Sequence, residues 1–95
     1  MDDWKYLEIG HELSLAKLHH FSIKKQQASG EVEFLITVHE AAQAQMGDML
    51  FFAQADKDTN QKVAAYRPSG WSNTLGEALR LCIQNIQRFD YQPPE

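Results

Sequence analysis

The stretch from Ser72 to Phe89 constrains this chain most, because it has the pattern of one amphipathic helix with a defined start. Thr74 and Glu77 have the spacing of a capping box, in which each side chain accepts from the backbone N–H of the other residue. Apolar residues then recur at spacings of four and three, on one side of a helix. They are Leu75, Leu79, Cys82, Ile86 and Phe89. Two prolines follow, so the pattern predicts a helix that ends near Phe89 or Asp90.

The chain ahead of this helix has the two-residue period of β-strands. Residues 18–26 alternate around two apolar positions, and residues 31–39 alternate most regularly. Between them, residues 26–30 have the composition of a hairpin loop, with Gly30 able to take a positive φ. Residues 40–47 are then predicted as a connection that holds one short helical turn at most.

Residues 1–17 carry two conflicting signals. Their large aliphatic residues share an odd-numbered register, which suits a strand. These are Leu7, Ile9, Leu13 and Leu15. The residue types suit a helix, but the apolar positions scatter on a helical wheel. We therefore favour extended structure, with Gly10 as a bend or bulge.

Residues 49–53 form an apolar run that does not alternate. A strand of this kind is normally covered on both faces, which predicts a central place in the sheet. A polar turn at residues 56–60 follows, and residues 62–67 are predicted as the returning partner strand. Residues 68–70 end that strand and are predicted as a loop that leads into the helix.

These segments predict an α+β fold, an antiparallel β-sheet of four or five strands with a C-terminal helix packed on one face as a two-layer sandwich. The 95 residues suit one domain, 1–95, whose core forms without metal or disulfide. No apolar run is long enough to span a membrane, and the acidic start is unlike a secretory leader. With a single cysteine, the sequence favours a reducing, cytoplasmic setting.

One helix covers one face of a sheet, whereas residues 49–53 are apolar on both faces and Leu35 lies on the otherwise polar face of its strand. The second face therefore needs a cover, from the N-terminal segment or from a second copy of the protein. We favour a non-catalytic module that self-associates, most simply as a two-fold homodimer, or that contacts a partner protein. The residues expected at this interface are Leu35, Leu50, Phe52, Tyr66 and Trp71. The alternative for Trp71 is packing over the start of the helix.

The sequence predicts no catalytic residue, no metal site and no cofactor. His19 and His20 are adjacent, so on a strand they point to opposite faces and cannot hold one ion together. Zinc sites usually show paired spacings such as Cys-x-x-Cys, and the chain has none. Cys82 lies on the apolar side of the helix, where a cysteine serves as a small hydrophobic side chain.

Two further functions stay open. One is a nucleic-acid or anion binder, and its basic residues would be Lys57, Lys62, Arg67 and Arg80. The net charge of −4 and the acids interleaved among these cations argue against nucleic acid. A weaker anion site at the helix start would use Arg67, Ser69 and Ser72. The other function is a small enzyme or ligand carrier with a pocket between sheet and helix, using His39, Tyr66 or Asp48.

Overall fold

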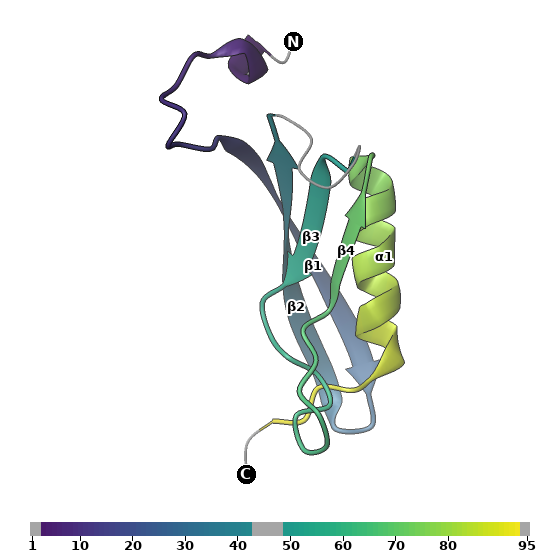
Figure 1. The fold of residues 1–95 in the computed structure, drawn as a ribbon. Coiled ribbons are helices and arrows are strands. Elements are labelled where there is room, and N and C mark those ends of the chain that lie inside the picture. The colour runs from purple at the N-terminus through teal and green to yellow at the C-terminus, as the bar shows by residue number, and fades with distance from the viewer. Residues whose placement is uncertain (1–2, 43–48, 94–95) are drawn as a thin grey trace.

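The computed structural model describes residues 3–42 and 49–93, which form one antiparallel sheet with one α-helix packed on it (Figure 1). This confirms the predicted α+β class. The sheet has four strands in the order β1-β2-β3-β4, so each strand pairs with its neighbours in the chain. The elements are the 3-10 helix η1 (Asp3–Tyr6), β1 (Ala16–Gln27), β2 (Gly30–Ala41), β3 (Phe51–Ala55), β4 (Ser69–Ser72) and α1 (Leu75–Arg88).

The helix begins and ends where its sequence predicts. Thr74 is the N-cap in extended conformation, and its hydroxyl accepts from the Glu77 backbone N–H at 3.2 Å. The second half of the predicted capping box is replaced, because the Glu77 carboxylate pairs with Arg80 one turn further along. At the other end, Phe89 returns to an extended conformation and caps α1.

The hydrophobic core lies between α1 and the middle of the sheet. Alternation along β2 turns every second side chain toward the helix, and β3 does the same with small residues. The buried apolar residues are Phe34, Ile36, Val38, Ala53, Ala55, Ala78, Cys82 and Ile86. Ala53 and Ala55 on β3 and Gly70 on β4 let the helix approach closely. A Cβ on Gly70 would lie 2.7 Å from the Ala78 carbonyl oxygen, so glycine is required there.

The fourth strand is not where the sequence predicts it. Asn60 takes a left-handed conformation with φ of 57°, and its carbonyl accepts from the N–H groups of Val63 and Ala64. The chain therefore turns within residues 62–67, which make a single bridge, Thr59 to Tyr66, instead of a strand. The strand that pairs with β3 is Ser69–Ser72, where we expected a loop.

The central strand is confirmed in its position and displaced by two residues, from 49–53 to Phe51–Ala55. Its two faces differ from the prediction. Ala53 and Ala55 are buried under α1, whereas Phe52 points to the face that the helix does not cover. Residues 40 and 41 belong to β2, and the rest of the predicted connection, 43–48, lies outside the described residues.

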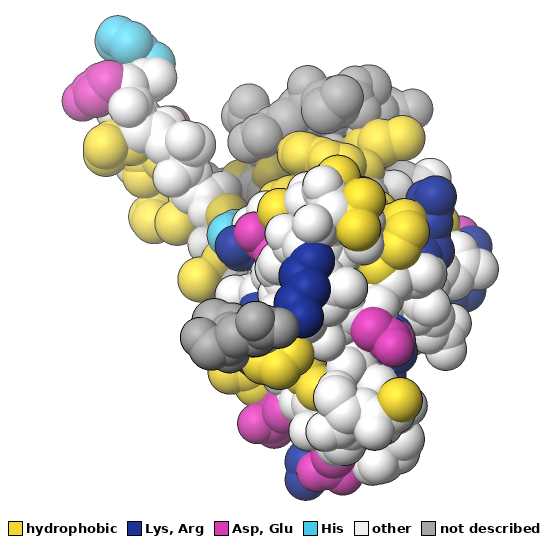
Figure 2. Space-filling model, turned by 90° about the horizontal axis from the view of Figure 1, so that it is seen from below, with side chains coloured by type: hydrophobic (Ala, Val, Ile, Leu, Met, Phe, Trp, Pro, Cys, Tyr) yellow, Lys and Arg dark blue, Asp and Glu magenta, His cyan; other side chains and the backbone are white. Residues whose placement is uncertain are grey.

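The N-terminal segment is extended only in part. Residues 3–6 form the short helix η1, a departure from the prediction, and residues 16 and 17 already belong to β1. Between them, residues 7–15 (the N-terminal loop) have no regular structure apart from a turn, in which the Leu13 N–H donates to the Gly10 carbonyl at 2.9 Å. Figures 1 and 2 show this loop projecting from the body at one end of the sheet.

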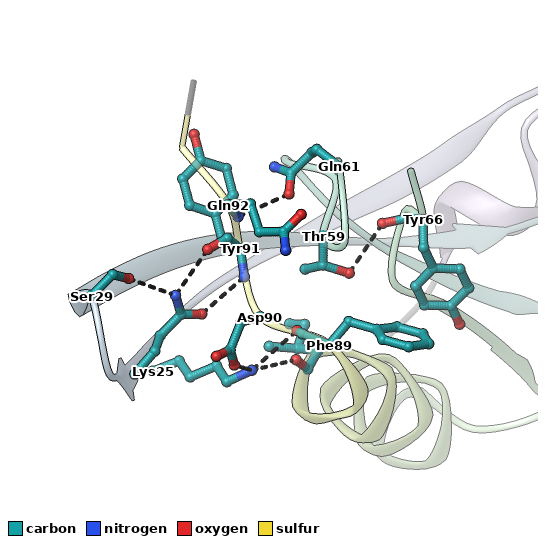
Figure 3. Close-up of polar contacts among 11 residues, drawn as sticks. Lys25, Ser29, Thr59, Gln61, Tyr66, Phe89, Asp90, Tyr91 and Gln92 are labelled. Carbon is teal, nitrogen blue, oxygen red and sulfur yellow. Dashed lines mark hydrogen bonds and ion pairs between the residues drawn. The ribbon is translucent and has the colours of Figure 1, made fainter. Parts of the chain in front are cut away.

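The end of the helix is attached to the edge strand (Figure 3). From β1, Lys25 Nζ donates to the carbonyls of Ile86 and Phe89 at 3.0 and 3.1 Å and pairs with Asp90. Two residues further along β1, the Gln27 side chain makes two hydrogen bonds with the Tyr91 backbone, each 3.0 Å long. Because α1 itself lies over β2, β3 and β4, these contacts tie β1 to the helical layer.

Candidate functional site: the open face of the sheet

The sheet surface opposite α1 is the candidate site, and we call it the open face. The register places its side chains, because directly paired residues of antiparallel strands share a face. His39 pairs with Leu18 on one side and with Phe52 on the other, and Phe52 pairs with Trp71. The residues on the open face are Ala16, Leu18, His20, Ser22, Lys24 and Gln26 of β1, Glu31, Glu33, Leu35, Thr37, His39 and Ala41 of β2, Phe52 and Gln54 of β3, and Ser69 and Trp71 of β4.

Three aromatic rings form a row across the open face. The His39 and Phe52 ring centroids are 6.0 Å apart, and those of Phe52 and Trp71 are 4.4 Å apart with an angle of 32° between the planes. Each ring comes from a different strand, so their contact depends on the pairing register of β2, β3 and β4. The rings bury part of one another and present the rest as one aromatic surface.

A shallow groove of about 700 Å³ lies beside this row, over β1 and β2. Its apolar walls include Leu18 and Leu35, whose exposed fractions are 48% and 50%. Its polar lining includes His20 and Thr37, whose Nδ1 and Oγ1 atoms are 3.3 Å apart. The groove is therefore lined by apolar and polar side chains together, among them the charged residues Asp56 and Arg67.

The cations at one end of the groove are already paired with carboxylates. Arg67 Nε donates to Asp58, and another of its nitrogens faces the Ala55 carbonyl. Lys57 pairs with Asp56, whose other oxygen accepts from the Leu35 backbone N–H at 3.0 Å. This rim therefore offers little uncompensated positive charge to an anionic ligand.

A smaller cavity of about 210 Å³ lies at the other end of the open face. Leu50, Phe52 and Trp71 line it together with Ser14 and Leu15. The base of the N-terminal loop is therefore in contact with the aromatic end of the open face.

The residues predicted for an interface fall in two places. Leu35, Phe52 and Trp71 are on the open face, and Leu50 lines the cavity beside it. Tyr66 lies elsewhere, in the loop between β3 and β4, where its ring meets Phe89 edge-on at 5.7 Å. The sequence reasoning did not name Leu18, whose place on this face depends on its pairing with His39.

The Trp71 side chain lies on the open face and does not pack over the start of α1, because its ring stacks on Phe52 on the side of the sheet away from the helix.

The three residues of the weaker anion site do not converge. Ser69 pairs with Gln54 on the open face, whereas Ser72 is on the helix side and buried. Arg67 is neutralised by its carboxylate partner, so we build no anion site on this group.

Cys82 and Glu40 are the two buried groups with altered acidity. Burial raises the pKa of the Cys82 thiol to about 11, and its Sγ faces the Pro68 carbonyl at 3.5 Å, so the thiol stays protonated.

Lys5 and His19 donate to the Glu40 carboxylate at 2.8 and 2.9 Å. The Lys5 ammonium holds the pKa of that carboxyl below its usual range against the opposing effect of burial, and His19 adds to the lowering. This cluster attaches η1 to the end of β2.

Within residues 3–42 and 49–93, no three His, Cys, Asp or Glu side chains come together as a metal site would require. Asp48, considered above as a catalytic residue, lies outside this part of the chain. In the same ranges, no helix combines the length and the apolar composition needed to cross a membrane. The chain matches no protein-family model, no curated protein and no solved structure with which it was compared.

Proposed function

We propose that this protein is a non-catalytic interaction module that self-associates through the open face of its sheet. The observation that carries the proposal is the aromatic row His39–Phe52–Trp71 next to the half-exposed side chains of Leu18 and Leu35. Soluble monomers rarely leave a contiguous apolar surface uncovered, and large ones mark sites of interaction.

The chemistry of the face supports a protein partner. Interface centres are enriched in aromatic residues and poor in charge, and their rims are polar. Among the described residues, the part of the open face around the aromatic row has no Lys, Arg, Asp or Glu, whereas Lys24 and Glu33 lie at one end of the face and the Arg67–Asp58 pair lies at its edge. Two such faces pack about 10 Å apart when sheets stack.

The same geometry argues against a nucleic-acid partner. Stacking platforms for single strands combine aromatic rings with a positively charged groove. Here Lys57 and Arg67 each pair with an aspartate, and Arg80 pairs with Glu77 on the helix, away from the rings. The rings are present, but the charge that attracts phosphates is neutralised.

The test is a concentration series in analytical ultracentrifugation. We expect a dimer at micromolar concentration and a loss of at least about tenfold in affinity for Leu35→Asp, because a carboxylate would be buried at the interface. Val63→Asp is the matched control, because Val63 is 81% exposed in the loop between β3 and β4 and away from the open face. A wild-type monomer throughout the series, or an equally tight Leu35→Asp dimer, would overturn the proposal.

A further inference from the structure

The N-terminal loop, residues 7–15, presents apolar side chains that its own subunit leaves uncovered. Leu7 and Leu13 have exposed fractions of 63% and 61%, and Ile9 is also exposed. Figure 2 shows hydrophobic side chains along the projecting segment. A nine-residue loop with four large aliphatic residues and neither lysine nor arginine is unlike an ordinary solvated connection.

Both ends of this loop are fixed to the subunit. At its start, the Lys5–Glu40 ion pair holds η1 against the end of β2. At its end, the Leu15 carbonyl accepts from the Ala42 N–H at 3.2 Å, which extends the β1–β2 pairing by one residue. The loop between these anchors projects beyond the end of the sheet (Figure 1).

The loop and the open face border the same small cavity. The base of the loop, Ser14 and Leu15, lines the small cavity together with Phe52 and Trp71. Anything that packs on the aromatic row therefore lies next to the loop as well.

The reach of the loop fits the gap between two stacked sheets. Nine residues have an extended length of about 30 Å, so a loop held at both ends projects by up to about 15 Å. Stacked sheets lie about 10 Å apart. The tip is therefore long enough to cross that layer and contact the second subunit.

We infer that the N-terminal loop of each subunit docks on a second copy of this chain, where Leu7 and Leu13 cover the edge of the partner's open face. Two-fold symmetry repeats the contact, so each loop completes the interface of the other subunit. This inference rests on the proposed self-association and names the segment that completes it.

The first experiment measures the dimer dissociation constant of the Leu7→Ser/Leu13→Ser variant by sedimentation. We expect a weakening of at least about 100-fold, because the symmetric dimer would lose four aliphatic contacts. Glu8→Ser/Glu12→Ser is the control from the same loop and should dimerise within about threefold of wild type. The monomer fold, followed by circular dichroism, should be unchanged in both variants because the loop lies outside the core.

The second experiment places a photo-reactive benzophenone side chain at position 13. Irradiation should give a covalent dimer whose cross-link maps to β1 or β2 of the other chain, whereas the same group at position 63 should give none. A cross-link within one chain, or a leucine variant that dimerises as tightly as wild type, would overturn the inference and leave the proposed function standing. If the wild-type protein forms no dimer, both the proposed self-association and the inference about the loop are wrong.

Discussion

Replacing Gly70 by alanine should push α1 away from β4. The added Cβ would lie 2.7 Å from the Ala78 carbonyl oxygen and 2.7 Å from the Leu81 Cβ, whereas ordinary contact begins at 3.4 Å. The shortfall is 3.4 − 2.7 = 0.7 Å, and it falls on helix backbone, which cannot rotate away. Overpacking of this kind costs about 1–3 kcal/mol. Removing glycine from a strand recovers about 0.5–1 kcal/mol, so we expect a net loss of about 1–2 kcal/mol.

Gly76→Ala is the matched control, because it adds the same methyl group where no atom lies within 4 Å. It sits in the first turn of α1, where alanine should add up to about 0.5–1 kcal/mol of stability. The two variants should therefore differ by roughly 2 kcal/mol, or about 1–2 M in the midpoint of urea unfolding for a small protein. The midpoints must be compared at one protein concentration, because self-association would shift both. If Gly70→Ala unfolds at the same urea concentration as Gly76→Ala or a higher one, the close approach of helix and strand is wrong.

Two other contacts give measurable consequences. Lys25→Met should lower the free energy of unfolding by about 2 kcal/mol in thermal or urea melts, because the carbonyls of Ile86 and Phe89 lose a charged donor. Lys24→Met is the control and should have little effect on the free energy of unfolding, because Lys24 points to the open face, away from α1. The pKa of Glu40 is lowered, so its ion pair with Lys5 stabilises the fold fully at pH values above the ordinary carboxyl pKa of 4.5. This stabilisation is lost as the pH falls through the lowered pKa, because the carboxylate becomes protonated. The stability difference between wild type and Glu40→Gln should therefore narrow in melts below pH 4.5, and a difference that is constant with pH would contradict this role for the ion pair.

The predictable parts of the fold are those with local signals. Thr74 and the apolar spacing define α1 without reference to any other segment, and the alternation in β1 and β2 does the same for the first hairpin. β4 has no such signal, because Ser-Gly-Trp-Ser has the composition of a turn. It becomes a strand through its hydrogen bonds to β3 and through the close packing of α1 on Gly70, both of which are tertiary.

The candidate site was predictable in its residue types but not in its arrangement. Leu35, Phe52 and Trp71 could be named from the apolar pattern, but which face each side chain takes depends on register. A slip of one residue would send every side chain of a strand to the other face. Tyr66 was grouped with them because residues 62–67 were predicted as a strand. The left-handed turn at Asn60 places it in a loop against the end of α1 instead.

The distribution of side-chain size on β3 and β4 supports self-association independently of any exposed fraction. Toward α1, these strands present one large side chain, Phe51, and otherwise small residues that let the helix come close: Ala53, Ala55, Gly70 and Ser72. Toward the open face, they present Phe52 and Trp71 beside the polar side chains of Gln54 and Ser69. A face that served only to meet water would gain nothing from aromatic side chains, because their stabilising effect comes from burial. The strands thus place two of their three large aromatic side chains on the side that one subunit does not bury, and a second copy stacked on that side would bury them.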